Sequence, residues 1–557
     1  MPDHGLETLD YAVLGLYLLF TFGIALWFGR KQHNTEDFFL GGRRMPWFAV
    51  GLSILATLMS TISYLAVPGE MIRRGIGYFT GYIAIPFSMI VVLRLFVPFF
   101  MRLRMTSAYE YLERRFNYSV RLIAAVLFIM MRLGWMSMVV YLASMAVDTM
   151  KGDDLAWPPG PDIYWWIALV GFFAAIYTTV GGIKSMIWTD VLQFLLMLAG
   201  VLLAIGYVVY ATGTGPVSWW ETAAAKATGH EPAPFFTLDL TVRVTVVTAV
   251  MNMFFWTIST HGSDQVVLQR YFSTNSLGAA LRSYLVNVTA EVTMLLLLAF
   301  SGLALLAFYL ENPGLLPAGT DAMKMGDTLF THFLSHQLPA GVAGLIMAGF
   351  LCDAMQTLES GVNAITAVAT TDIIERLGWN KRWRLSNLAV ARIITLAISL
   401  VVTLIAYQIA YKAIVEKEQI IDMMPKFFNM FLGPLAGLFF IGMFLPWASA
   451  RSAVPAVLCG LTLSWLWSWW KEIVVWIAKN VTTQLRDALE WSWWREFFGG
   501  ERTPTVLLAV AVPCCTTFFI AAVLSCIIER RGANAGAAYA WWPVMRREPD
   551  QGERNEV

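Results

Sequence analysis

Long apolar runs separated by short polar connections occupy almost the whole chain. Runs of roughly 18 to 25 residues with few charges are long enough to cross a bilayer as helices. Counting them predicts about thirteen membrane-spanning helices, near residues 8–29, 46–70, 78–101, 119–149, 163–180, 186–211, 242–262, 283–310, 340–374, 390–412, 425–446, 451–477 and 503–528. The pattern therefore predicts an all-α polytopic membrane protein.

Composition agrees with this class and excludes others. The 557 residues are 58% hydrophobic and 14% charged, with a mean hydropathy of +0.61. The net charge is only +1 and no basic patch with interleaved aromatics is present, so we expect no nucleic-acid partner. The first apolar run follows Glu7 and Asp10 and has no small-residue cleavage site, which favours a retained helix over a signal peptide.

Positively charged residues are concentrated in alternate connections, which the positive-inside rule places in the cytoplasm. These residues include Arg30, Lys31, Arg43, Arg44, Arg102, Arg104, Arg114, Arg115, Arg270, Arg282, Arg376, Lys381, Arg382 and Arg384. We therefore expect a multi-pass protein of the plasma (cell inner) membrane, with its N-terminus outside and its C-terminus in the cytoplasm. Arg73 and Arg74 are exceptions, because they fall in the first outer loop.

The most informative apolar run is Leu338–Ile373, because a cluster of polar and acidic residues interrupts it. The cluster contains Asp353, Gln356, Thr357, Glu359, Ser360 and Asn363. At helical spacing, Asp353, Thr357 and Ser360 share one face, and Gln356 and Glu359 share a second. A carboxylate in the middle of a membrane costs several kcal/mol and is usually retained because something binds it. The alternative is a pair of buried structural acids that stabilise helix packing.

Two five-helix blocks, 46–211 and 242–446, each open with a span that carries glycine and polar residues in its middle. These interruptions lie in 49–69 and 256–262. Transporters built from inverted repeats place such broken helices at the midplane, where freed carbonyls hold ions and substrate. Carbonyls near Ala56 to Met59 would suit a hard monovalent cation. Close packing of small residues is the alternative.

These blocks predict a division of the chain into six parts. They are an N-terminal extra helix and loop (1–45), the first repeat (46–211), an outer loop (212–241), the second repeat (242–446), two further helices with a Trp-rich outer connection (447–530) and a cytoplasmic tail (531–557).

Two more charged residues fall within predicted spans. Asp190 lies just inside the cytoplasmic end of a helix. Either the helix dipole stabilises its negative charge there, or the side chain faces an ion exit route. Arg132 lies in mid-span and needs an anionic partner, for which Asp190 and Glu359 are the candidates. No phosphate-binding loop with its lysine, nucleophile elbow or redox cysteine pair is found, so we expect no enzyme and no ATP-driven pump.

Several blocks, taken in order, resemble the sodium/solute symporters over about residues 10 to 450. The blocks are GGRRMPWFAVGLSILATLMSTISYLAVPGE, RLGWMSMVVYLASMA, GGIKSMIWTDVLQ, SDQVVLQRYFS, the Leu338–Ile373 run and GPLAGLFFIGMFLP. The resemblance implies a LeuT-type five-plus-five inverted repeat, with one helix before it and two after.

The resemblance also implies a main sodium site. It would use backbone carbonyls of Ala56, Met59 and Asp353, with side-chain oxygens of Gln356 and Thr357. The family usually has a small residue followed by two hydroxyl residues at the last three positions, so Thr357 fits while Asp353 and Gln356 depart.

A second ion site known in some members would draw on Asp190, Glu359 and Ser360. Ser360 fits that pattern, whereas Glu359 replaces a hydroxyl. A carboxylate at Asp353 either strengthens sodium binding or is protonated in the low-dielectric midplane, which would make the coupling ion a proton. If Asp353 pairs with a neighbour instead, the protein would be an uncoupled facilitator.

Substrate contacts in the family come from the two broken helices and the last core helix. The matching positions here are Ser60, Ser63, Tyr64, Thr257, Thr260, His261 and Asn429. Leu58 and Ser63 stand where sugar carriers have amides, so nothing favours a sugar.

The sequence thus predicts a secondary active symporter that imports a small polar organic solute with Na+ by alternating access. The same fold with H+ coupling, an uncoupled carrier and a transporter-like membrane sensor are the alternatives. We expect the solute and the lipid bilayer as partners and infer no obligatory protein partner.

Overall fold

The computed structural model describes residues 7–29, 39–59, 61–103, 105, 107–150, 162–180, 183–226, 236–237, 242, 244–317, 319–379, 387–416, 423, 425–470, 472–473, 505–529 and 535–546. Within these ranges every regular element is an α-, 3-10 or π-helix, and none is a strand. The all-α prediction is therefore confirmed.

The first half of the chain forms helices that are mostly joined by short connections. They are α1 (Thr8–Gly29), η1 (Gly41–Arg43), α3 (Trp47–Leu58), α4 (Thr61–Arg74), η2 (Gly75–Ala84), α5 (Ile85–Val91), η3 (Val92–Phe96), α6 (Val97–Leu103), α7 (Ala108–Arg115), α8 (Tyr118–Met150), α9 (Asp162–Val180), α10 (Ile183–Thr212) and α11 (Pro216–Lys226).

The second half of the chain forms the remaining helices. Its helices are α12 (Val246–Ser263), α13 (Gln265–Phe272), α14 (Leu277–Glu311), η4 (Pro313–Leu315), α15 (Gly326–Gln337), α16 (Val342–Val368), η5 (Ala369–Ile374), α18 (Asn387–Glu416), η6 (Pro425–Asn429), α20 (Met430–Phe444), α21 (Ala450–Ser468), η7 (Val506–Leu508), α25 (Ala511–Ile528), η8 (Ala535–Tyr539) and α26 (Trp541–Arg546).

Each predicted repeat opens with a helix that the structure breaks in two. The first break separates α3 from α4, where Met59 adopts an extended conformation (φ −104°, ψ 96°), as predicted. The second break was predicted within 256–262 but falls later, at Asp264 (φ −84°, ψ 117°). Asp264 ends α12 there and caps α13, since its carboxylate accepts a 3.0 Å hydrogen bond from the Val266 amide.

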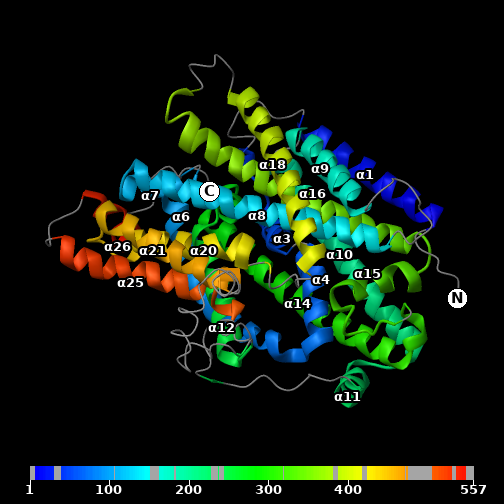
Figure 1. Ribbon diagram of the computed structural model, residues 1–557. Coiled ribbons are helices and arrows are strands. Elements are labelled where there is room, and N and C mark those ends of the chain that lie inside the picture. Colours follow the sequence, from blue (N-terminus) through cyan, green and yellow to red (C-terminus); the bar gives the residue numbers. More distant parts are fainter. Residues whose placement is uncertain are drawn as a thin grey trace, which may run out of the picture.

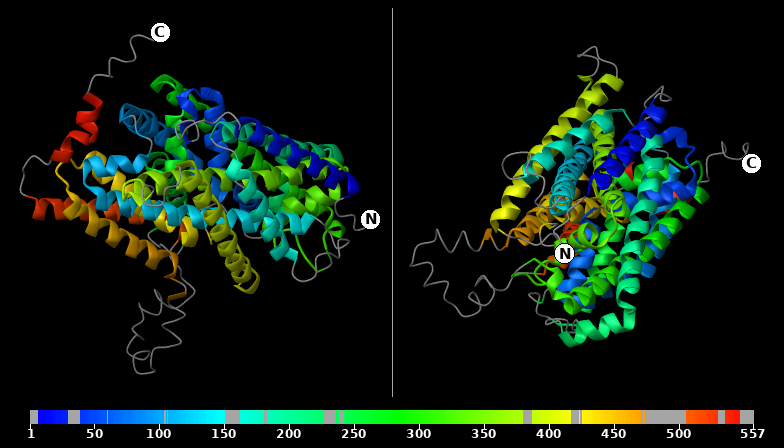
Figure 2. Two further views of the ribbon diagram at one scale, coloured as in Figure 1. Left: turned by 90° about the horizontal axis from the view of Figure 1, so that it is seen from above. Right: turned by 90° about the vertical axis from the view of Figure 1, so that its right-hand side faces the viewer.

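The helices pack as a layered bundle. α8 packs against α9, α16 and α18, and α1 lies against α10 and α16 (Figure 1). α21 and α25 pack together at the opposite edge of the molecule from α1, and Figure 2 shows the two groups well apart. Most of the buried side chains form one continuous apolar core.

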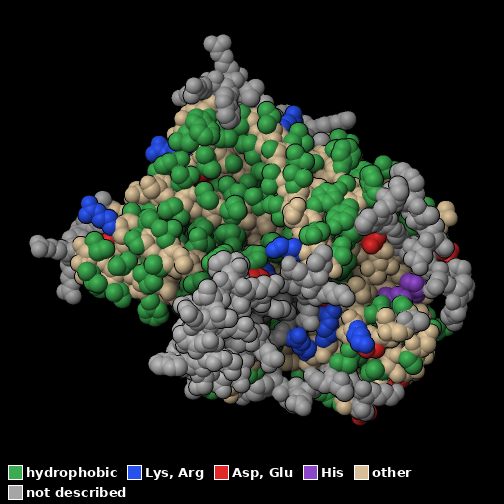
Figure 3. Space-filling view, in the orientation of Figure 1, with side chains coloured by type: hydrophobic (Ala, Val, Ile, Leu, Met, Phe, Trp, Pro, Cys, Tyr) green, Lys and Arg blue, Asp and Glu red, His purple; other side chains and the backbone are tan. Residues whose placement is uncertain are grey.

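The outer surface is suited to lipid. Eight helical segments of the described chain are long and apolar enough to cross a membrane, and shorter apolar helices accompany them. Large hydrophobic side chains such as Phe172, Leu400 and Leu404 are exposed on them. Figure 3 shows a broad apolar face with lysines and arginines at its margins. The total of about thirteen crossings stays a prediction.

The two arginines that break the charge rule lie at the end of α4. Arg73 donates a 2.7 Å hydrogen bond to Asp327 of α15, so its charge is paired within the protein. The orientation of the termini stays a prediction.

Candidate ion and solute site

The last carbonyl groups of α3 have no hydrogen-bond donor within the helix itself. α3 ends at Leu58, and the Met59 amide makes a 2.7 Å hydrogen bond with the Leu55 carbonyl. The Ala56 carbonyl belongs to the last turn, whose carbonyls have no donor within α3 itself, and the helix dipole makes this end electronegative. Ala56 and Met59 are both buried. This end of α3 therefore suits a cation.

α16 packs against α3 and carries polar side chains that have no hydrogen-bond partner among the described residues. Gln356 and Thr357 are each 1% exposed. The Gln356 amide and the Thr357 hydroxyl form no hydrogen bond with any other described residue. Buried polar atoms normally have partners, so these orphaned oxygens fit the ligand set predicted for Na+. The side chain of Asp353 lies outside the described residues.

Asp190 and Ser360, predicted for a second ion site, are brought together by Arg270. The Arg270 guanidinium donates to Asp190 at 3.2 Å and to Ser360 at 2.7 Å. Ser53 of α3 donates to the same carboxylate and accepts a 2.7 Å hydrogen bond from Arg270. Glu359 is fully buried on α16. A protein cation thus already contacts two of the three predicted ligands.

The prediction that Arg132 pairs with Asp190 or Glu359 was wrong. Arg132 of α8 forms a buried ion pair with Asp264 and not with Asp190 or Glu359. The pair is made possible by the second helix break, which leaves the Asp264 carboxylate at the end of α12. Sequence spacing cannot show that α8 passes this break.

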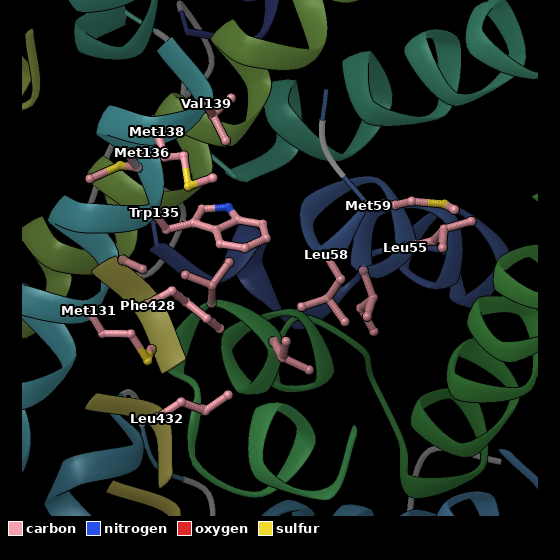
Figure 4. Close-up of a cluster of buried hydrophobic side chains, with 14 of the residues drawn as sticks. Leu55, Leu58, Met59, Met131, Trp135, Met136, Met138, Val139, Phe428 and Leu432 are labelled. Atoms are coloured by element: carbon pink, nitrogen blue, oxygen red, sulfur yellow. The ribbon is translucent and has the colours of Figure 1, made fainter. Parts of the chain in front are cut away.

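A cavity of about 120 Å³ lies beside the first helix break, with room for several waters or a small solute. Residues from the α3–α4 break, η2, α8, α12, α14, η6 and η7 line it: Leu55, Leu58, Met59, Ser63, Ala66, Val67, Tyr78, Tyr82, Trp135, Asn252, Met253, Trp256, Glu291, Leu295, Asn429 and Leu507. Figure 4 shows Trp135 projecting from α8 toward Leu58. The cavity thus lies beside the α3–α4 break, and Met59, which is predicted as an ion ligand, lines it.

The cavity brings together only part of the predicted substrate set. Ser63 and Asn429 line it. Tyr64 lines another pocket, between α4, α10, α15 and α16, and its hydroxyl lies 3.3 Å from the Met294 sulfur of α14. Thr260 hydrogen-bonds back to its own helix, and the His261 ring contacts the Tyr271 hydroxyl at 2.8 Å.

Two further predicted substrate residues remain. Thr257 is buried on α12 beside Trp256, and its hydroxyl has no hydrogen-bond partner among the described residues. Ser60 lies outside the described residues.

Sequence reasoning missed several lining residues. Asn252 and Trp256 precede the predicted second interruption or stand at its start, and Tyr78 and Tyr82 come from a helix with no evident signal. Glu291 did have a signal, because it is an acid within a predicted span, the feature that singled out Asp353 and Glu359.

The family model described as sodium:solute symporter family matches residues 38–460. The chain belongs to the sodium:solute symporter family. This symporter is 29% identical over 462 residues to the sodium/sialic acid symporter SiaT of Proteus mirabilis, covering 83% of this chain and 90% of that protein. It is 30% identical over 467 residues to the sodium/iodide cotransporter of Homo sapiens, covering 82% of this chain and 69% of that protein.

A solved structure is also similar. The substrate-bound outward-open state of a Na+-coupled sialic acid symporter matches this symporter with a TM-score of 0.75 and 26% identity, covering 95% of this chain and all of that one (100%). The predicted LeuT-type repeat is therefore confirmed. The symporter is a multi-pass membrane protein that couples transport of a small-molecule solute to Na+.

Proposed function

We propose that this symporter imports a small polar organic solute through the cavity beside the α3–α4 break, with Na+ bound between α3 and α16. The observation that carries the proposal is that Gln356 and Thr357, on a helix that packs against α3, are buried and have no hydrogen-bond partner among the described residues. Their oxygens and the Ala56 and Met59 carbonyls would hold the ion. Asp353 completes the proposed set.

Coupling follows from the shared break. Met59 both lines the cavity and belongs to the proposed ion site, so an ion that fixes the end of α3 also shapes the cavity. The ion and the solute would then each raise the affinity of the other by the same factor. Rocking of the two broken helices against the surrounding helices would expose the cavity to each side in turn. The N-terminus would lie outside and the C-terminus in the cytoplasm.

A second ion, with Asp190, Glu359 and Ser360 as ligands, would have to share Asp190 and Ser360 with Arg270. Because the guanidinium already supplies a positive charge there, we favour a single Na+ per cycle at the α3–α16 site. Proton coupling through Asp353 is the competing proposal.

The test is thermal unfolding of the purified protein in NaCl or KCl at equal ionic strength. We expect a Na+-specific rise in melting temperature that Thr357→Ala reduces, with a loss of Na+ affinity of about tenfold. Thr366→Ala is the matched control, since Thr366 is buried on the same helix and contacts Thr395 at 3.3 Å. Equal stabilisation by K+ would refute the Na+ site. A pH-dependent rise abolished by Asp353→Asn would favour H+.

A further inference from the structure

A carboxylate lines the solute cavity. Glu291 stands near the middle of α14, and among the described residues that line the cavity it is the only one with a formal charge. It lies within electrostatic range of Tyr82, another lining residue. A charge at this depth of a membrane helix is costly unless something compensates it.

No side chain in the described part of the protein neutralises Glu291. It forms no hydrogen bond or ion pair with any described residue, and two fully buried arginines of the core have other partners. Arg132 pairs with Asp264, and Arg270 pairs with Asp190. Unless the carboxyl takes up a proton, a cation that enters the cavity can supply the compensating charge.

The rest of the cavity wall suits an organic cation. Four aromatic rings line it, from Tyr78, Tyr82, Trp135 and Trp256. Ring faces attract ammonium groups by about 0.5 to 2 kcal/mol each, and aromatic cages are a recurrent way to bind quaternary ammonium compounds. Trp135 is held in place by Phe428, with ring centroids 4.7 Å apart (Figure 4).

Two side-chain amides complete the polar part of the wall. Asn252 and Asn429 both line the cavity, and the Asn429 carbonyl oxygen has no hydrogen-bond partner among the described residues. An amide oxygen accepts hydrogen bonds from N–H or O–H groups. The Asn429 side-chain oxygen is therefore a second acceptor in the cavity wall, beside the Glu291 carboxylate, and it brings no positive charge.

We propose that the cavity selects solutes that carry a positively charged ammonium group, with Glu291 as the counter-ion and the four aromatic rings as its walls. This inference rests on the proposed function, because it assigns the solute class of the same cavity. It separates this symporter from the similar proteins named for sialic acid and iodide, both of which are anions. A single uncompensated carboxylate would repel such ligands.

Binding to the purified full-length protein in NaCl tests the charge preference. The ammonium probes are choline, ethanolamine and glycine betaine. The neutral probe is the carbon isostere of choline, in which a tert-butyl group replaces the trimethylammonium group. The anionic probes are lactate and N-acetylneuraminate. We expect at least one ammonium probe to raise the melting temperature, and neither its neutral analogue nor the anions to do so.

Variants connect this preference to Glu291. Glu291→Gln keeps the shape of the side chain and removes its charge, so we expect it to weaken binding of the ammonium probe about tenfold or more. Trp256→Leu removes one aromatic ring but leaves Glu291 in place, and we expect it to weaken binding of the same probe. Glu311→Gln is the control, because Glu311 is an exposed acid at the end of the same helix.

Each other outcome overturns the inference. Binding of an anion, or of the neutral isostere as tightly as choline, would show that Glu291 does not set the charge of the solute. Failure of every ammonium probe, while Na+ still stabilises the protein, would refute the solute class and leave the sodium site intact. If Glu291→Gln abolishes stabilisation by Na+ alone, Glu291 is an ion ligand and not the counter-ion of a solute.

Discussion

Arg270 of α13 and Asp190 of α10 form a buried ion pair at 3.2 Å, with side chains 1% and 0% exposed. Ser53 of α3 and Ser360 of α16 both bond to the same guanidinium. The pair therefore ties one half of each broken helix, α3 and α13, to two long helices of the bundle. We infer that it fixes both half-helices in this conformation.

Removing one partner of this pair is expected to be far worse than removing both. Asp190→Leu leaves a buried guanidinium without its counter-ion, which typically costs about 3–5 kcal/mol. The double variant Asp190→Leu/Arg270→Met has no stranded charge and should recover much of the melting temperature. Asp321→Asn is the control, because its pair with Lys324 is exposed. A single variant as stable as the wild type would contradict this role.

Asp10 of α1 caps the N-terminus of α16. Its carboxylate accepts hydrogen bonds from the amides of Gly341 and Gly344, at 2.7 and 2.6 Å, where α16 begins. The N-cap position of α16, Gly341, has no side chain to do this. Asp10→Ala is therefore expected to lower stability by about 1–2 kcal/mol, the usual cost of a lost cap.

Thermal unfolding measures this loss, and Asp10→Asn separates capping from charge. Asparagine keeps an acceptor oxygen, so it should recover part of the melting temperature. An unchanged melting temperature in Asp10→Ala would show that the α1–α16 contact does not depend on the cap.

Gly134 permits the close approach of α8 to η6 beside the cavity. A Cβ atom at this position would collide with the Phe427 carbonyl, next to the Trp135–Phe428 contact. Gly134→Ala is expected to cost about 1–3 kcal/mol, as overpacking usually does, and to reduce solute uptake. Gly206→Ala is the matched control, since nothing lies within 4 Å of its added Cβ. Equal effects of the two substitutions would refute the packing argument.

The sequence predicted the first helix break and the polar face of α16, because both depend on local residue types. Small and hydroxyl residues surround Met59 in the sequence, and Gln356 and Thr357 are adjacent in an apolar run. The contacts between distant helices were not predictable in this way. Arg132 pairs with Asp264 and Arg270 pairs with Asp190, and both pairs join helices that are far apart in the sequence.

The solute cavity shows the same limit. Its wall combines residues of helices that are far apart in the chain, such as Tyr78, Trp135 and Glu291. No single stretch carries that pattern. Conversely, Tyr64 and His261 lie on the expected helices, but their side chains turn to Met294 and Tyr271. Helix position was predictable from the sequence, whereas side-chain direction required the packed structure.

Glu113 of α7 joins two arginines on the side of the bundle that we assign to the cytoplasm. It accepts a 2.5 Å hydrogen bond from Arg121 and a 2.7 Å hydrogen bond from Arg376. Burial alone would raise the pKa of the Glu113 carboxyl, but the two guanidinium groups outweigh it and hold the pKa below its usual value. Because the folded-state pKa is lowered, the stability from these contacts is present above the pKa of an unfolded glutamate, about 4.3. That stability is lost as the pH falls through the folded-state value.

Glu113→Gln should therefore lower the melting temperature at neutral pH, by an amount equivalent to about 1 kcal/mol because the site is partly exposed. The difference from the wild type should shrink as the pH falls below about 4, where the wild-type carboxyl also becomes neutral. Glu110→Gln is the control on the same helix, since its pair with Arg114 spans one helical turn at the surface and contributes little. A Glu113→Gln deficit that stays constant from neutral to acid pH would show that the side chain acts through its shape rather than its charge.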